Sequence, residues 1–240
     1  MTAQQSDIPT NALPTQARQK AEIDRYLSTL FAQIEAVQRP DSPSLIISGT
    51  RRCGKTKVAR AIAARHGYMH LPTDKLRNAT YLNCPEPEKR RIAKYVFRRI
   101  LLRFPTGVMI EGTGAMDAPC ELPLWAVRRG IAFFAIGYSL DRLDDKHRDL
   151  LAYRQSNPCW TKRSKSDAEM RGFARNIIRR SQEIKAFCDT QALHYFDLDS
   201  AAFESERDRI VHAIETELRA VRKMPEDAPP GLMARLKFWR

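Results

Sequence analysis

The chain has 240 residues and carries 41 lysines and arginines against 28 aspartates and glutamates, a formal net charge of +13. Hydrophobic residues make up 43% of it, enough for one ordinary domain with additions or for two small ones. No apolar run approaches the roughly 20 residues that a membrane-crossing helix needs, and residues 1–16 lack the features of a secretory signal. The sequence therefore predicts no membrane-spanning helix.

The positive charge has two interpretations, and both stay open. In an arginine-rich proteome, arginine would occupy every exposed face; alternatively, the chain binds an anionic partner such as a phosphorylated metabolite, a nucleotide or RNA. The cysteines are widely spaced, odd in number, and form neither a zinc pattern nor a disulfide framework. They are Cys53, Cys84, Cys120, Cys159 and Cys188. This usage predicts a protein of the reducing cytoplasm.

The predicted elements begin with polar residues 1–16, which we expect to be disordered. A helix is predicted over 17–40, because five aliphatic residues repeat there at helical spacing. They are Ile23, Leu27, Leu30, Ile34 and Val37. Two prolines, Pro40 and Pro43, end this helix and start a turn.

Short apolar strands then alternate with helices over residues 44–222. The predicted strands cover 45–47, 68–71, 107–112, 131–138 and 193–198. The predicted helices cover about 55–66, 86–104, 141–153, 167–187 and 203–222, with a further helical stretch after residue 72. This alternation predicts an α/β domain with a five-stranded parallel sheet and helices on both faces, plus the added N-terminal helix. Residues 223–240 form a separate basic tail.

A glycine-rich motif, SGTRRCGKT, follows the first strand. Its spacing predicts a loop whose backbone N–H groups wrap phosphate, with Lys55 reaching the outer phosphates and the Thr56 hydroxyl binding Mg²⁺. The predicted nucleotide-binding residues are Gly49, Thr50, Arg51, Arg52, Cys53, Gly54, Lys55 and Thr56. The alternative, a tight turn with an accidental lysine, is disfavoured because a buried strand stands directly before the motif.

The strand, loop and helix around this motif resemble the P-loop kinases of the nucleoside-monophosphate, shikimate and gluconate kinase type. The resemblance covers about residues 44–215 and includes a second strand leading to Asp74 and a third ending in Glu111. It implies an ATP-dependent kinase that uses Mg²⁺ and works mainly by positioning and charge neutralisation. It also places the nucleotide base near the turn at 199–203.

In that family an acidic residue after the second strand contacts the acceptor hydroxyl, and Asp74 occupies its place. We expect the strand that leads to Asp74 to lie beside the strand of the phosphate loop. The surrounding pattern, Thr73 to Arg77, also resembles kinases that phosphorylate small acids, sugars and some tRNA-bound serine. Alternatively, Thr73 or Asp74 simply caps the next helix.

Glu111 occupies the place of the family's acid on the third strand, where it would hold Mg²⁺ through a water molecule. A carboxylate directly after Val108, Met109 and Ile110 is costly to bury unless a cation meets it. The alternative is a strand-end residue that faces solvent.

The resemblance further implies a lid over about residues 142–180 whose arginines close on the transferred phosphate. We select Arg163 and Arg171 as the catalytic candidates, with Arg142 as a third. Guanidinium groups suit the charge that develops on phosphate oxygens. The alternative for most of these arginines is a solvated helix face.

The sequence therefore predicts an ATP-dependent cytoplasmic kinase that acts on a small metabolite, with an acceptor region over about 73–104. Basic residues of that region favour an anionic acceptor. They are Lys75, Arg77, Lys89, Arg90, Arg91, Lys94, Arg98 and Arg99. A kinase acting on RNA or aminoacyl-tRNA is less favoured, because aromatic residues are not interleaved with the basic runs. A nucleotide-driven switch or ATPase module is a third hypothesis, and no oligomeric state is predicted.

Overall fold

A computed structural model describes residues 12–80, 86–116, 121–156 and 166–222 of the chain. The strands are β1 (Leu45–Gly49), β2 (Met69–Pro72), β3 (Val108–Glu111), β4 (Ala132–Gly137) and β5 (His194–Asp197). The helices are α1 (Ala12–Glu35), α2 (Lys55–His66), α3 (Thr73–Thr80), α4 (Glu86–Arg103), α5 (Glu121–Val127), α6 (Leu143–Ser156), α7 (Asp167–Thr190) and α8 (Phe203–Arg222). A 3₁₀ helix, η1 (Thr113–Met116), follows β3. The 223–240 tail lies outside the described residues.

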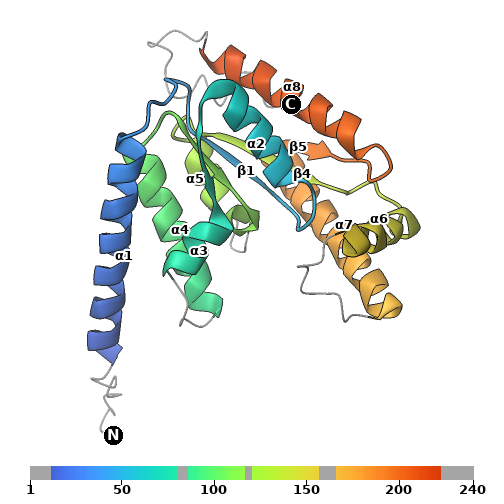
Figure 1. Cartoon of the computed structure of the whole chain (residues 1–240), viewed down its shortest axis with the longest axis horizontal. Coiled ribbons are helices and arrows are strands. Elements are labelled where there is room, and N and C mark those ends of the chain that lie inside the picture. Colours follow the sequence, from blue (N-terminus) through green and yellow to red (C-terminus); the bar gives the residue numbers. More distant parts are fainter. Residues whose placement is uncertain (1–11, 81–85, 117–120, 157–165, 223–240) are drawn as a thin grey trace, which may run out of the picture.

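The strands form one parallel sheet in the order β2-β3-β1-β4-β5, which confirms the predicted five-stranded α/β fold. The strand that precedes the glycine-rich loop, β1, is central. Its residue Ile46 pairs with Ile110 of β3 on one side and Phe133 of β4 on the other. The carboxyl end of β1 therefore lies between the ends of two buried strands (Figure 1).

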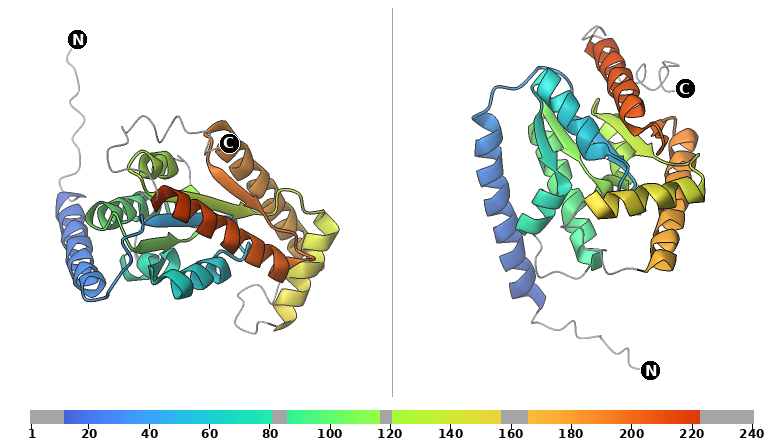
Figure 2. Two further views of the ribbon diagram at one scale, coloured as in Figure 1. Left: turned by 90° about the horizontal axis from the view of Figure 1, so that it is seen from above. Right: turned by 45° about the vertical axis from the view of Figure 1, so that its right-hand side comes forward.

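Helices cover both faces of the sheet, as Figure 2 shows. Successive β1 residues point to opposite sides, so Leu45 and Ile47 belong to the apolar core that includes α2 and α8, while Ile46 belongs to the core that includes α1, α4 and α5. Helix α7 contributes to both cores, through Ile177 on one side and Ile184 on the other. Two apolar layers thus hold the sheet and its loops in place.

The expected position of the second strand is wrong. Strand β2 lies at the edge of the sheet, and β3 separates it from β1. The physical reason is visible in burial, because every residue of β3 is buried whereas Met69, His70 and Pro72 of β2 are only half buried. A proline and a histidine suit an edge strand better than an interior one. Asp74 therefore lies one strand further from the phosphate-loop strand than predicted.

The added N-terminal helix is present with different limits. Helix α1 begins at Ala12 rather than at 17, and it ends at Glu35 rather than near 40. Residues 12–16 are therefore helical, and Pro14 fits there because the first turn of a helix needs no N–H donor at that position. The helix packs on α3 and α4, with the ring of Phe31 meeting that of Phe104 edge to face at 5.4 Å.

The sequence pattern did not predict α5 or η1, which both follow β3 in the chain.

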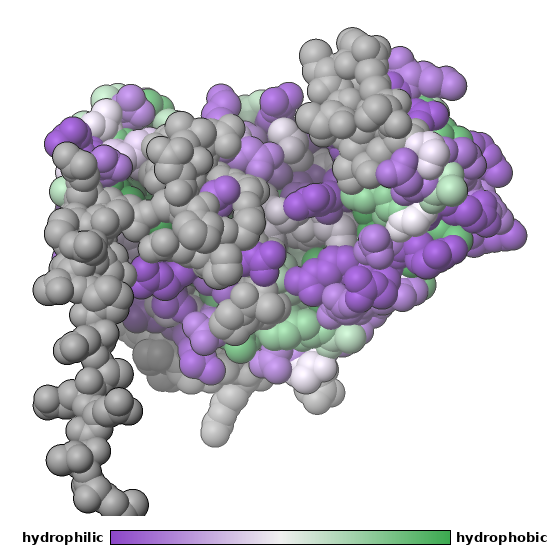
Figure 3. Space-filling view, turned by 90° about the horizontal axis from the view of Figure 1, so that it is seen from below, coloured by the Kyte–Doolittle hydropathy of each residue, from purple (hydrophilic) through white to green (hydrophobic). Residues whose placement is uncertain are grey.

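On the face in Figure 3, hydrophilic side chains cover most of the described surface, and apolar ones gather in small patches. Among the described helices, none has a stretch that is both long and apolar enough to cross a bilayer.

Candidate active site

The glycine-rich loop connects β1 to α2 and turns through a run of unusual backbone conformations. Gly49, Arg52 and Gly54 all have positive φ angles, of 137°, 61° and 72°. A Cβ atom on Gly49 would lie 1.8 Å from the carbonyl oxygen of Ile136, so only glycine fits against β4 there. Such a loop presents its backbone N–H groups to one side, which is the arrangement that binds phosphate.

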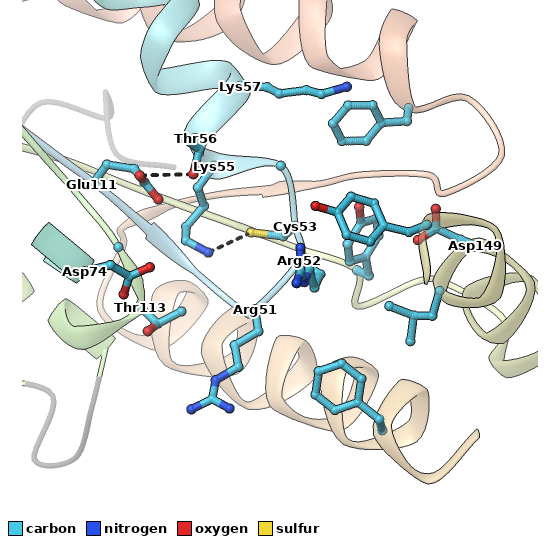
Figure 4. Close-up of a pocket in the computed structure, with 17 residues that line it drawn as sticks. Arg51, Arg52, Cys53, Lys55, Thr56, Lys57, Asp74, Glu111, Thr113 and Asp149 are labelled. Atoms are coloured by element: carbon cyan, nitrogen blue, oxygen red, sulfur yellow. Dashed lines mark hydrogen bonds between the residues drawn. The ribbon is translucent and has the colours of Figure 1, made fainter. Parts of the chain in front are cut away.

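Lys55 begins α2, and its side chain folds back across the loop. Its ammonium donates a hydrogen bond of 2.5 Å to the carbonyl oxygen of Thr50 and lies 3.5 Å from the sulfur of Cys53 (Figure 4). Lys55 is only 7% exposed yet lines the cavity described below. A positive charge is therefore held at the mouth of the loop, where outer phosphates of a nucleotide would lie.

The next residue, Thr56, is paired with the acid of β3. Its hydroxyl donates a hydrogen bond of 3.1 Å to Oε2 of Glu111, whose side chain is buried. The imidazole Nε2 of His70 lies 3.6 Å from the same oxygen. Glu111 is thus not the exposed strand end of the alternative interpretation. A hydroxyl and a carboxylate are hard oxygen ligands, so this pair fits Mg²⁺ directly or through water.

Asp74 lies in the first turn of α3, and its exposed side chain lines the same cavity. In Figure 4 its carboxylate points toward Lys55 and lies beside Thr113 of η1. Within the described residues it makes no hydrogen bond, so no capping bond from this side chain holds the start of α3. The carboxylate is free to meet a ligand.

A close contact joins the two acidic residues through their neighbours. A Cβ atom on Gly112 would lie 1.7 Å from Oγ1 of Thr73, so the backbone after Glu111 touches the residue before Asp74. The hydroxyl of Ser48 also donates a hydrogen bond of 2.8 Å to the carbonyl oxygen of Gly112. The carboxyl ends of β1 and β3 and the start of α3 are thereby packed together.

A cavity of about 690 Å³ surrounds the loop. One end is polar and is lined by Asp74, Glu111 and Thr113, while the other lies against α6, α7 and the start of α8. The loop and the first turn of α2 contribute every residue from Arg51 to Lys57. All predicted loop residues except Gly49 and Thr50, together with Asp74 and Glu111, therefore line one cavity.

The lid arginines are not brought to this cavity in the described residues. Arg171 is exposed, does not line the cavity, and donates a hydrogen bond of 2.6 Å to the carboxylate of Asp144. Arg163 lies outside the described residues. Arg51 does line the cavity and is exposed, and its guanidinium lies below Lys55 on the side of Asp74 and Thr113 (Figure 4).

Among the basic residues of the acceptor region whose side chains the structure describes, none lines the cavity, neither Lys75 of α3 nor those on α4. Of the turn at 199–203, where the nucleotide base was expected, Phe203 alone lines it. The ring of Phe203 lies against the loop, since a Cβ atom on Gly54 would be 2.5 Å from it. The Lys57 ammonium is 4.7 Å from the centre of that ring.

Sequence reasoning missed the residues at the α6 and α7 end of the cavity. They are Tyr138, Asp149, Leu150, Tyr153 and Phe173. A weak signal existed, because residues 149 and 153 are four apart and share one face of a helix. That spacing is equally typical of a solvated helix, so it could not have singled out a site.

Comparison with known proteins gives the fold. No family model matches the chain, and no curated protein matches it. A solved shikimate kinase from Bacteroides thetaiotaomicron is similar over 72% of this chain and 98% of its own, with a TM-score of 0.52 and 20% sequence identity. Together with the phosphate loop and the sheet order, this similarity shows that the chain has a P-loop kinase fold.

Two further solved structures are similar with lower TM-scores. A gluconokinase from Sinorhizobium meliloti 1021 is matched over 75% of this chain and 99% of its own, at 13% identity and a TM-score of 0.42. A polyphosphate kinase 2 from Arthrobacter aurescens TC1 is matched over 98% of this chain and 89% of its own, at 15% identity and a TM-score of 0.45.

Proposed function

From its P-loop kinase fold, we propose that the chain is an ATP-dependent phosphotransferase. It transfers the γ-phosphoryl group to a hydroxyl or phosphate group of a small, anionic metabolite and uses Mg²⁺, in the reducing cytoplasm. The observation that supports this most strongly is a single cavity lined by Lys55, Thr56, Glu111 and Asp74. Phosphoryl transfer needs a phosphate cradle, a cation site and an acceptor-positioning group at one place.

The loop and its neighbours bind the nucleotide end. Backbone N–H groups and the Lys55 ammonium bind the outer phosphates, and charge-assisted hydrogen bonds of this kind are the stronger ones. Thr56 and Glu111 would hold Mg²⁺, which neutralises charge on the phosphate oxygens when bound. The hydrogen bond of 3.1 Å between the two side chains supports this assignment, because it places their oxygens next to each other.

Asp74 serves the acceptor end of the cavity. Its carboxylate accepts a hydrogen bond from the acceptor hydroxyl and aligns that oxygen with the γ-phosphorus. As the new oxygen–phosphorus bond forms, the bond from the γ-phosphorus to its bridging oxygen breaks, and the hydroxyl proton passes to Asp74. Orientation contributes more than basicity, because the transition state is loose.

Arginine supplies the remaining positive charge. Arg51 is the described arginine best placed for it, since its guanidinium lines the acceptor end and makes no ion pair within the described residues. This placement, rather than the charge of α4, supports an anionic acceptor. Arg163 and Arg171 remain candidates, and Arg171 would have to release Asp144 to take part.

The test is a screen of ATP consumption over a metabolite library, with phosphorylated products identified by mass and Lys55→Ala as the control. We expect one class of anionic metabolite to gain about 80 Da, the mass of one added phosphoryl group, and to do so only with the unmodified protein. Consumption of ATP without any acceptor would support a switch or ATPase instead. Phosphorylation of an RNA, with binding that withstands physiological salt, would support the nucleic-acid kinase.

A further inference from the structure

Positive charge gathers on one side of the molecule, on residues that the proposed phosphoryl transfer does not use. Residues 89–110, which include most of α4, and residues 122–140, which include most of α5, contain no aspartate or glutamate. Helices α4 and α5 belong to one apolar core, whereas α8, which mixes acidic and basic residues, belongs to the core on the opposite face (Figure 2). The basic residues of the two acid-free segments are Lys89, Arg90, Arg91, Lys94, Arg98, Arg99, Arg103, Arg128 and Arg129.

The ring of Trp125 on α5 joins these residues into one surface. The guanidinium of Arg98 lies 5.6 Å from the centre of that ring, and the guanidinium of Arg129 lies 4.8 Å from it. Arg98 is also 3.5 Å from the carboxylate of Glu121, but this pair is exposed and contributes little. We define the basic face by its exposed or half-exposed side chains, which are Arg90, Arg91, Lys94, Arg98, Arg99, Arg128 and Arg129.

Much of the charge on the basic face is not neutralised. Arg90, Arg99, Arg128 and Arg129 form no ion pair within the described residues. Arg99 instead donates a hydrogen bond of 2.7 Å to the hydroxyl of Tyr95, which leaves its charge in place. Three arginines of α7 differ, because each of them pairs with a carboxylate. They are Arg171, Arg179 and Arg180.

This arrangement suits a ligand with many phosphates. Neighbouring guanidinium groups that lack carboxylates repel one another, so an anion that meets several of them at once is attracted strongly. Arg90, Lys94 and Arg98 recur every four residues along α4, about 6 Å apart in rise, and so form a row of charges. Packing of Arg98 and Arg129 on an aromatic ring limits their motion, while their N–H groups can still donate to phosphate oxygens.

We propose that the basic face binds a nucleic-acid strand through its phosphates, at a site separate from the kinase cavity. Arg128 and Arg129 lie in the turn before β4, at the amino ends of the parallel strands, whereas the cavity lies at their carboxyl ends. The strand is therefore bound in addition to the acceptor and does not replace it. Contacts to phosphates carry no sequence information, so binding does not depend on base sequence.

An anionic membrane is a poorer match for the basic face. Membrane-surface helices insert a continuous apolar side, and the large apolar side chains exposed on α4 are only Tyr95 and Leu102 within the described residues. The hydroxyl of Tyr95 is moreover held by Arg99. The charge without an apolar side favours the nucleic acid.

The experiment measures binding of a labelled single-stranded oligouridylate by fluorescence anisotropy, without nucleotide, between 50 and 200 mM salt. Contacts from the four arginines without ion pairs predict that log affinity falls against log salt with a slope of about −2.8. Affinity should then be about 50-fold lower at 200 mM than at 50 mM salt.

Two double variants with the same loss of charge locate the site. Arg99→Gln combined with Arg129→Gln should weaken binding at 50 mM salt and halve the slope to about −1.4. Arg60→Gln combined with Arg219→Gln is the matched control and should keep the slope of the unmodified protein. Arg60 of α2 and Arg219 of α8 are exposed, lack ion pairs within the described residues, and lie on helices of the opposite face.

Arg99→Lys combined with Arg129→Lys keeps both charges and changes the packing on Tyr95 and Trp125. The slope should stay near that of the unmodified protein, which distinguishes lost charge from lost packing. Equal losses in the two glutamine double variants would overturn the proposal, because net charge and not the basic face would then determine binding. Binding of phosphatidylserine vesicles, without binding of the oligouridylate, would overturn it in favour of a membrane.

The proposal and the proposed function fail separately. Lys55→Ala should bind the oligouridylate as tightly as the unmodified protein, since Lys55 is not part of the basic face, while its ATP binding is weakened. Displacement of the oligouridylate by MgATP at a concentration that just saturates the cavity would place the strand in the cavity and overturn the proposal. A protein that binds the strand but phosphorylates no metabolite would contradict the proposed function alone.

Discussion

The hydroxyl of Thr56 donates a hydrogen bond of 3.1 Å to Glu111, although 55 residues separate them in the chain. The contact joins the start of α2 to the end of β3, across adjacent strands of the sheet. From it we predict that Glu111→Gln, which keeps the shape and removes the charge, lowers activity by about 10- to 100-fold and raises the Mg²⁺ concentration needed for half-maximal rate. A Mg²⁺ titration of the rate is the measurement, and an unchanged midpoint would make Glu111 structural.

Lys55→Ala should weaken ATP binding by about 10- to 100-fold and abolish transfer, because the cation near the outer phosphates is lost. Thr56→Ala should instead impair mainly the Mg²⁺ dependence. Calorimetric titration with ATP separates the two. Equal affinity and turnover in Lys55→Ala and the unmodified protein would contradict the assignment of the loop.

Asp74→Asn should leave ATP binding intact and reduce transfer by about 10²- to 10⁴-fold, the usual effect of a positioned acid or base. Asparagine keeps a hydrogen bond but does not accept the proton. A capping role would give almost no change, because both residues cap helices well. Turnover is measured with the acceptor found in the metabolite screen, and a rate close to that of the unmodified protein would leave Asp74 without a catalytic role.

Arg51→Ala should lower kcat by about 10²- to 10³-fold with a smaller change in ATP affinity, since its guanidinium serves charge that develops during transfer. Arg60→Ala is the control, because Arg60 is an exposed arginine of α2 that does not line the cavity. Steady-state kinetics of both variants make the comparison. A rise in the KM for the acceptor, with kcat unchanged, would assign Arg51 to acceptor binding and not to catalysis.

Glu215 predicts a pH dependence of stability. Burial raises the pKa of this carboxyl, but hydrogen bonds from His66 at 3.0 Å and Arg65 at 3.2 Å outweigh burial and lower it overall. A lowered folded pKa stabilises the fold above the ordinary value of 4.5, and this contribution is lost as pH falls through the folded pKa. Glu215→Gln should therefore lower the free energy of unfolding at pH 7 by about 1 kcal/mol. The value is kept this small because Arg65 is half exposed, so solvent screens its charge.

The check is the denaturant midpoint of both proteins at pH 7 and at pH 3. The difference between them should be clear at pH 7 and should shrink at pH 3. Glu204→Gln on the same helix is the control, since its carboxylate is exposed and pairs with an exposed lysine. An equal difference at both pH values would show that ionisation of Glu215 does not contribute.

The sequence predicted the sheet and the loop because their signals are local. A buried strand, two glycines at fixed spacing and a helix follow one another between Leu45 and His66, so no knowledge of the tertiary fold was needed. The position of β2 was not predicted, because hydrophobic pattern fixes that a segment is a strand and not which strand it joins. Its histidine and proline carried the only indication of an edge.

The aromatic end of the cavity could not be predicted, since it depends on how α6 and α7 pack against the loop. Lys146 illustrates the difficulty, because it lies in the charged sequence LDDKHRDL and would be taken for a surface residue. It is buried, and its ammonium contacts Tyr138 and Ser200, which both lie outside α6. The spacing of apolar and charged residues within α6 does not predict contacts with those neighbours.

The contact between Gly112 and Thr73 has a mechanical consequence. The Gly112 backbone touches the Thr73 side chain and leaves no room for a single added carbon. The strand end that bears Glu111 is therefore packed tightly against the helix that bears Asp74. The end of β3 and the start of α3 therefore keep one relative placement, so the groups proposed to hold Mg²⁺ and to orient the acceptor belong to one packed unit of the fold.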